Sequence, residues 1–170
     1  MARPLTIAAP FGGVVVSLDS VGDEVFAAGM LGPGCAIDPD PAESDVLAPV
    51  GGVVAALHPH AFVIQSDPAR SVLVHLGIES VGLGEPAFAG VLEAGAAART
   101  GDVVVRWDVA AVRSAGRSVL CPVIALQASS EALRCLVRPG AAVSAGDPIL
   151  EWEASAGPFG SPGPSGVPSD

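Results

Sequence analysis

Lysine and tyrosine are absent from this chain of 170 residues, so all eight formal positive charges are arginines. The lack of lysine excludes P-loop nucleotide-binding proteins, Schiff-base enzymes and carrier domains that attach biotin or lipoate to a lysine. Aromatic residues make up only 4% of the chain, so a core has to be built mainly from aliphatic side chains. Half of the residues are apolar, which excludes wholesale disorder.

Acidic residues outnumber basic ones, 18 to 8, so the formal net charge is −10. This balance argues against binding to nucleic acid or to an anionic membrane surface. No apolar run approaches about 18 residues, and the first ten residues lack the charged-then-apolar pattern of a signal peptide. Cys35, Cys121 and Cys135 are odd in number and form no Cys-x-x-Cys pair, which favours buried thiols in a reducing compartment. We therefore expect a cytoplasmic protein with no membrane insertion.

The chain divides by composition into a folded part and a tail. We expect one domain over residues 1–153 and a disordered Pro/Gly/Ser-rich tail over residues 154–170. Two echoes lie inside the domain: APFGGVVVSL (9–18) recurs 39 residues later as APVGGVVAAL, and GAAARTGDVVVRWD (95–108) recurs 45 residues later as GAAVSAGDPILEWE. The period is not constant, so the pattern indicates duplicated β-hairpin units rather than a solenoid.

Short β-branched runs separated by Gly, Pro, Asp or Ser predict many strands, among them GCAIDP, AFVIQS, SVLVHLGI, PVIALQ, VVVRW and PILEW. This spacing predicts an all-β fold, an antiparallel β-sandwich or distorted barrel, with few helices. Short helices are expected after an Asp108 N-cap, over 86–95 and over 130–137.

All three histidines lie within 18 residues of one another, in HPHAFVIQSDPARSVLVHLGIESV (58–81). The turn-like DPAR predicts a hairpin that brings His60 and His75 to facing strand ends, about 5 Å apart at their Cβ atoms. A serine-hydrolase triad is disfavoured, since no G-x-S-x-G occurs. Zinc binding by the three imidazoles and phosphoryl transfer through one of them remain about equally compatible with the pattern.

The same segment resembles the active-site region of the glucose-type enzyme IIA proteins of the bacterial phosphoenolpyruvate-dependent sugar phosphotransferase system. In that family a histidine opening an HAF segment is followed 15 residues later by the histidine of a V-H-[FL]-G-I-[DE]-[ST]-V motif, and His60 and His75 occupy those two places. The resemblance extends over DEVFAAGMLGPGCAIDP, LAPVGGVV, GDVVVRWD, CPVIAL and GDPILEW, in order. It implies a β-sandwich built on a duplicated hybrid motif.

The resemblance also implies a phosphotransferase that needs no metal or cofactor. His75 would be the phosphorylated nucleophile, and His60 would support the transfer. His58, Gly77 and Glu79 would play supporting parts. His58 stands where many members carry a threonine, and Glu79 where an aspartate is common.

The implied partners are the carrier protein HPr, which donates the phosphoryl group, and the IIB domain of a glucose or N-acetylglucosamine-type IIB/IIC sugar permease, which accepts it. We expect Val25, Phe26, Phe62 and Ile78 to form an apolar docking surface around the histidines. The alternative function is a zinc-dependent hydrolase or peptidase that uses the histidines as metal ligands.

Overall fold

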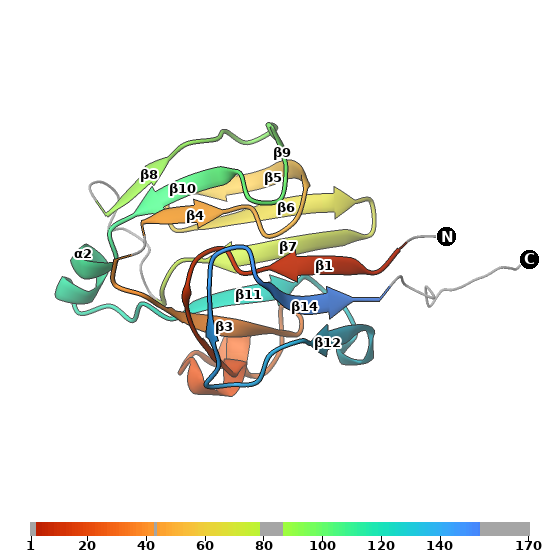
Figure 1. Cartoon of the computed structure of the whole chain (residues 1–170), viewed down its shortest axis with the longest axis horizontal. Helices are drawn as coiled ribbons and strands as arrows, with labels where there is room; N and C mark the ends of the chain where they lie inside the picture. The colour runs from red at the N-terminus through yellow and green to blue at the C-terminus, as the bar shows by residue number, and fades with distance from the viewer. Residues whose placement is uncertain (1–2, 43, 79–86, 154–170) are drawn as a thin grey trace, which may run out of the picture.

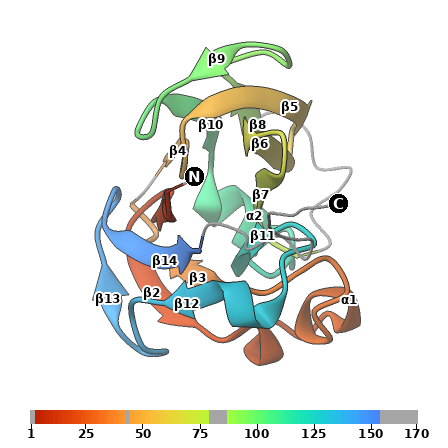
Figure 2. The same cartoon turned by 90° about the vertical axis from the view of Figure 1, so that its right-hand side faces the viewer.

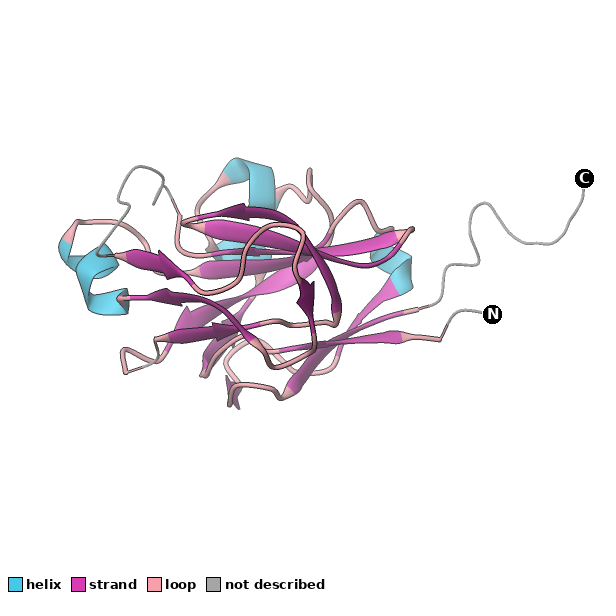
Figure 3. Cartoon of the chain, turned by 90° about the horizontal axis from the view of Figure 1, so that it is seen from above, coloured by secondary structure: helices cyan, strands magenta, loops and turns pink. Residues whose placement is uncertain are grey.

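Antiparallel strands make up most of the regular structure, and the computed structural model describes residues 3–42, 44–78 and 87–153 (Figures 1 and 3). The largest sheet contains β2 (Gly13–Val16), β3 (Gly34–Pro39), β5 (Gly52–His58), β6 (Ala61–Asp67), β7 (Arg70–His75), β9 (Ala97–Ala98), β11 (Cys121–Ala125) and β13 (Ala142–Val143). Their spatial order is β13-β2-β3-β11-β7-β6-β5-β9.

Two three-stranded sheets complete the sandwich. One consists of β1 (Leu5–Ala8), β14 (Pro148–Trp152) and β12 (Leu133–Cys135), and the other of β4 (Asp45–Leu47), β10 (Val103–Trp107) and β8 (Phe88–Gly90). Figure 2 shows β5, β6, β7, β11, β3 and β2 following one another around a curve, with β4, β10 and β14 at its open side. The predicted all-β antiparallel sandwich is confirmed.

The two internal sequence repeats correspond to repeated backbone contacts. The amide N–H of Ala9 donates to the carbonyl of Asp147 at 2.8 Å, and the N–H of Ala48, 39 residues later, donates to the carbonyl of Asp102 at 2.8 Å. Strand pairing repeats in the same way, since β13 pairs with β2 as β9 pairs with β5. The predicted duplication of β-hairpin units is therefore a structural one.

Each copy needs a glycine at the same place. A Cβ atom on Gly13 would lie 2.2 Å from the carbonyl oxygen of Asp38, and one on Gly52 would lie 2.1 Å from the carbonyl oxygen of Gln65. No side chain fits at such distances, so the Gly-Gly pairs allow the neighbouring strands to approach.

The hydrophobic core is mainly aliphatic, as the composition predicts, with Phe11, Phe88 and Trp107 in ring contact inside it. A second, smaller cluster lies on the other face of the large sheet, beneath the segment that carries α1 (Glu24–Ala27). Strand β7 divides its side chains between the two, because Val72 and Val74 belong to the main core and Leu73 packs on the second cluster. By this alternation His75 shares a face with Leu73, outside the main core.

Of the three predicted helices, one is confirmed. The carboxylate of Asp108 accepts from the N–H of Ala111 at 3.0 Å and begins α2 (Val109–Ser114). Two are wrong: 86–95 contains strand β8, paired with β10, and 130–137 contains a single 3₁₀ turn (Ser130–Ala132) followed by strand β12, paired with β14. In both segments the long-range strand pairing outweighs a local helical spacing.

Within the part of the chain that the structure describes, no helix has the length and apolar character needed to cross a bilayer. The two α-helices in this described part have four and six residues, and a membrane span takes about 20.

Candidate active site

Strand register brings the three histidines together. His58 at the end of β5 pairs with Ala61 at the start of β6, and Ala61 pairs in turn with His75 at the end of β7. Paired residues present their side chains on the same face of a sheet, so His58 and His75 flank Ala61. His60 lies in the tight turn between β5 and β6, where its carbonyl accepts the N–H of Leu76 at 2.7 Å. The predicted hairpin and the meeting of His60 with His75 are confirmed.

The aromatic rings form a row. The ring centres of His58 and His60 are 5.9 Å apart, those of His60 and His75 are 5.1 Å apart, and those of His75 and Phe26 are 5.3 Å apart. His60 and His75 meet edge to face, with 70° between their planes. His75 is therefore held between a partly buried imidazole and an aromatic ring.

One hydrogen bond fixes how the His75 ring can react. Its Nδ1 lies 2.7 Å from the carbonyl oxygen of Gly77. A carbonyl only accepts hydrogen bonds, so Nδ1 carries the proton and, in the neutral ring, the lone pair belongs to Nε2. The backbone of Gly77 has a φ of +80°, a left-handed conformation that glycine adopts readily. This turn directs the Gly77 carbonyl back towards the His75 ring.

Both site imidazoles favour the neutral form. Burial lowers the pKa of His75, against smaller opposing effects from the hydrogen bond to Gly77 and the charge of Asp23. Burial also lowers the pKa of His60, and the neighbouring charges of His75 and His58 lower it further. A neutral imidazole has a free lone pair, so His75 is ready to act as a nucleophile near neutral pH.

We expect the ring of His75 to titrate below 6.5, the ordinary value, when its carbon-bound protons are followed by NMR as the pH is changed. Because the folded chain binds protons at His60 and His75 less readily than the unfolded chain, the free energy of unfolding should fall as the pH drops through and below 6.5. The same titration in concentrated urea supplies the control, and a folded-state midpoint above 6.5 would contradict the expectation.

The predicted docking surface needs correction. Val25 is 42% exposed, but Phe26 is 6%, Phe62 0% and Ile78 7% exposed. Phe62 belongs to the main core, because it follows Ala61 on β6 and so points to the face opposite His75. Phe26 and Ile78 pack together in the second cluster beneath the site. Of the four predicted residues, only Val25 is exposed.

Sequence reasoning missed Met30, which is 71% exposed. Its N–H donates to the carbonyl of Val25 at 3.1 Å, so the turn that follows α1 folds back and is joined to Val25 within that helix. The sequence does contain a signal for this exposure in the segment EVFAAGML (24–31). This segment has more apolar residues than a short helix can bury on one face, so some of them must be exposed. Glu79, also predicted to support the site, lies outside the described residues.

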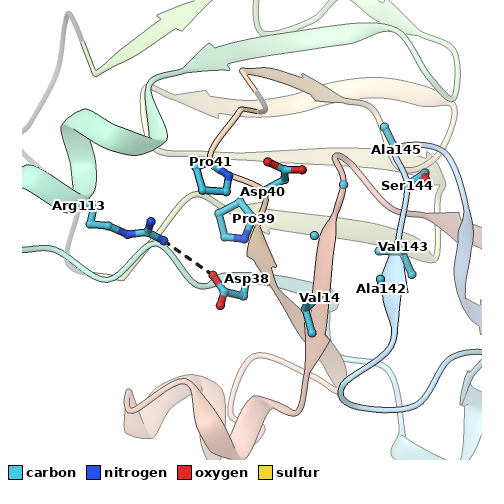
Figure 4. A pocket seen from close by; sticks show the side chains of 12 residues that line it. Val14, Asp38, Pro39, Asp40, Pro41, Arg113, Ala142, Val143, Ser144 and Ala145 are labelled. Atoms are coloured by element: carbon cyan, nitrogen blue, oxygen red, sulfur yellow. Dashed lines mark ion pairs between the residues drawn. The ribbon is translucent and has the colours of Figure 1, made fainter.

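A groove of about 600 Å³ lies elsewhere, where β2, β3 and β13 meet (Figure 4). Arg113 and Asp38 form an ion pair across one end of it at 4.0 Å. None of the residues that line it is a histidine.

The zinc alternative has no support in the geometry. Within 3–42, 44–78 and 87–153, no three His, Cys, Asp or Glu side chains are grouped so that they could hold a metal ion. The hypothesis of a zinc-dependent hydrolase is therefore not supported by the described residues.

Together, the duplicated β-sandwich and the two neighbouring imidazoles define a class of antiparallel all-β domain with a pair of partly buried histidines that favour the neutral form. The family model described as "phosphoenolpyruvate-dependent sugar phosphotransferase system, EIIA 1" matches residues 5–131. The chain belongs to this family.

Its relatives include free-standing and fused proteins. It is 30% identical over 146 residues to the glucose-specific EIIA component of Haemophilus influenzae. The alignment covers 85% of this chain and 86% of that protein. It is 35% identical over 147 residues to the beta-glucoside-specific EIIBCA component of Halalkalibacterium halodurans, covering 85% of this chain but only 23% of that longer protein. The solved glucose permease IIA from Mycoplasma capricolum superposes with a TM-score of 0.79 at 32% identity, covering 88% of this chain and 96% of the other.

Proposed function

We propose that the domain, residues 1–153, is a cytoplasmic phosphocarrier that accepts a phosphoryl group from phospho-HPr on Nε2 of His75. The observation that carries this proposal is the hydrogen bond from Nδ1 of His75 to Gly77, which leaves Nε2 as the nucleophilic nitrogen. Attack forms the Nε2–P bond while the P–N bond of the donor's phosphohistidine breaks, so the donor's imidazole recovers its lone pair. No proton has to be gained or lost, and no base or metal is needed.

In the second step the phosphoryl group passes to a cysteine of the IIB domain of a sugar permease. The thiolate attacks phosphorus, and Nε2 of His75 leaves with the electron pair of the breaking bond. Because Nδ1 keeps its proton on the Gly77 carbonyl, the leaving group is a neutral imidazole rather than an anion. Relatives of this chain named glucose-specific and beta-glucoside-specific point to a permease of that sugar class.

His60 is suited to contact the phosphoryl oxygens, since its ring lies 5.1 Å from that of His75. A phosphoryl dianion on His75 favours the protonated form of a neighbouring imidazole, so His60 would donate a charge-assisted hydrogen bond. His58 is exposed, and its ring centre lies 5.9 Å from that of His60, on the side of His60 away from His75.

The docking surface that we propose consists of the exposed side chains of Val25 and Met30 beside the histidines. Val25 and Phe26 are neighbours on α1, and the Phe26 ring contacts His75. The proposed surface therefore lies next to the His75 side chain. The carboxylate of Asp23 caps α1 and accepts from the N–H of Val25 at 2.9 Å. Apolar side chains with acidic neighbours suit a basic partner such as HPr.

Replacing Val25 by Asp is expected to slow phosphoryl transfer from HPr by about tenfold, because a carboxylate would have to be desolvated in the contact. The matched control is Val53→Asp. Val53 is 45% exposed, close to the 42% of Val25, but stands near the opposite end of β5 from His58. Initial rates of label transfer from phospho-HPr measure the effect. Equal slowing in both variants would remove Val25 from the docking surface.

The proposed function is tested by incubating the protein with radiolabelled phosphoenolpyruvate, enzyme I and HPr. We expect one acid-labile, base-stable phosphohistidine per chain, and transfer of the label on adding a IIB domain. Failure to label in the presence of active HPr would overturn the proposal.

A further inference from the structure

The docking residues Val25 and Met30 lie in one segment, residues 25–31 (the docking segment), which leads from α1 towards β3. The start of this segment is fixed at the site, because the Phe26 ring contacts His75. Its end is held by a different part of the chain, the turn that follows β11. Because Met30 is 71% exposed, its position depends on how that end is held.

Hydrogen bonds between β11 and β3 continue beyond the start of β3. The N–H of Ala125, the last residue of β11, donates to the carbonyl of Pro33 at 2.9 Å. Two residues further, the N–H of Gln127 donates to the carbonyl of Leu31, the last residue of the docking segment, at 2.8 Å. Pro33 has no N–H to donate in return, so this junction depends on the N–H groups of Ala125 and Gln127.

The two segments approach closely at the junction. A Cβ atom on Gly32 would lie 2.2 Å from the carbonyl oxygen of Ala125 and 2.9 Å from the backbone nitrogen of Gln127. The turn after β11 is itself anchored to β7, since the N–H of Leu126 donates to the carbonyl of Ser71 at 3.0 Å. The docking segment therefore ends against backbone that is fixed to the middle of the large sheet.

Gln127 has an unusual backbone conformation. Among the residues that the structure describes, it is the single one other than glycine with a positive φ, +58°. It is the third residue of a β-turn in which the N–H of Ala128 donates to the carbonyl of Ala125 at 3.2 Å. A left-handed third position normally has Gly or Asn, and another residue there costs free energy. The strained residue is also the one that holds Leu31.

We propose that Gln127 is a positioning residue for docking: its left-handed backbone holds the Leu31 carbonyl and so fixes the docking segment where Val25 and Met30 meet HPr. The proposal rests on the proposed phosphocarrier function for its effect on HPr, but not for its effect on the order of the docking segment.

The role concerns binding rather than chemistry. Because β11 and β7 are antiparallel and Ala125 pairs with Val72, Gln127 lies near the start of β7, whereas His75 is the last residue of that strand. Loosening the junction should therefore raise the concentration of phospho-HPr that half-saturates transfer. The limiting rate at saturating phospho-HPr should stay unchanged.

Three substitutions of exposed side chains isolate the backbone effect. Gln127→Val disfavours the left-handed conformation, because a β-branched residue rarely adopts it. Gln127→Gly keeps that conformation available and is the rescue variant. Ser129→Val is the matched control, because Ser129 is exposed in the same loop but has an extended backbone, with φ −76° and ψ 149°.

Hydrogen exchange of the resting protein measures the order of the docking segment. In Gln127→Val, we expect the protection of the amide at position 127, and of the Met30 amide that donates to Val25, to fall at least about tenfold. Both amides should stay within about threefold of the parent in Gln127→Gly and Ser129→Val.

Single-turnover labelling over a range of phospho-HPr concentrations measures docking. We expect the half-saturating concentration to rise about tenfold in Gln127→Val alone, as for the loss of one apolar contact of an interface. Unchanged protection of Met30 in Gln127→Val would overturn the proposal, and so would an equal loss in Ser129→Val. A lower limiting rate at the same half-saturating concentration would also contradict it, because the turn would then act on the chemistry.

Should Gln127→Val not fold, Gly32→Ala decides the proposal, because its added Cβ forces the junction apart from the other side. Its control is Gly101→Ala, which also places a side chain at a positive φ, +96°, but with nothing within 4 Å of the added atom. The same losses are required in Gly32→Ala and not in Gly101→Ala. Hydrogen exchange needs no phosphoryl donor. A protein that HPr fails to label would thus disprove the phosphocarrier function while the hold of Gln127 on the docking segment is still measured.

Discussion

Replacing His75 by Gln is expected to lower phosphorylation by HPr at least about 1,000-fold, to the background of the assay. The amide of Gln fills a similar volume and can donate a hydrogen bond to the Gly77 carbonyl as Nδ1 does. Its nitrogen lone pair is delocalised into the carbonyl group, however, so it cannot attack phosphorus. The loss should therefore be one of chemistry rather than of folding.

The measurement is the amount of acid-labile label per chain after incubation with radiolabelled phosphoenolpyruvate, enzyme I and HPr. His58→Gln is the matched control, because it makes the same change at an exposed imidazole at the end of the row, with His60 between it and His75. Peptide mapping of the parent protein locates the label. Label on His60, or label that survives in His75→Gln, would reverse the roles assigned to the two histidines.

The hairpin that carries the site could be predicted from the sequence because its signals are local. Two β-branched runs flank Asp67 and Pro68, and the Asp67 carboxylate closes the turn by accepting the N–H of Ala69 at 2.9 Å. Such turn chemistry fixes the register of a hairpin. The meeting of His60 and His75 follows from that register.

The face of each side chain was harder to predict. Phe62 was expected at the docking surface because it is an apolar residue close to His60 in the sequence, and counting alternation from His60 would also place it on the histidine's face. His60 belongs to the turn, however, and the strand begins at Ala61, so the parity shifts by one residue and Phe62 enters the core. A shift of one residue at the start of a strand reverses every inward and outward assignment along it.

Contacts between distant segments were beyond local reasoning. Leu133, Leu136 and Val137 fit a helical spacing, but Leu133 pairs with Trp152 in a β-ladder that no local pattern reveals. Similarly, no local pattern shows that the carbonyl of Gly77 lies 2.7 Å from Nδ1 of His75; only the folded turn places it there. What the sequence alone could not supply at this site is the set of backbone groups that orient the reacting ring.

Replacing His60 by Gln is expected to separate the two transfer steps. Acceptance from HPr should slow by no more than about tenfold, because the nucleophile, His75, is untouched and Gln can still donate a hydrogen bond to the phosphoryl group. Transfer to the IIB cysteine should slow about 100-fold, the effect of removing one group that stabilises developing negative charge.

The asymmetry has an electrostatic cause. In acceptance, a neutral imidazole approaches a phosphoryl dianion, whereas in donation an anionic thiolate approaches it and is repelled. A protonated His60 beside the phosphoryl group offsets that repulsion, and an amide cannot take up the proton. The step with the charged nucleophile is therefore the one that needs an imidazole at position 60.

Single-turnover experiments measure the two steps apart, first by loading His60→Gln from phospho-HPr and then by chasing the isolated phosphorylated protein with a IIB domain. His58→Gln serves again as the control and should leave both rates within about threefold of the parent, since exposed charges interact weakly. Raising the pH should slow donation by the parent protein, as His60 loses its proton, and should leave donation by His60→Gln unaffected at pH values where the thiolate is fully formed. Equal slowing of acceptance and donation in His60→Gln would show that His60 orients His75 rather than stabilising charge on the phosphoryl group.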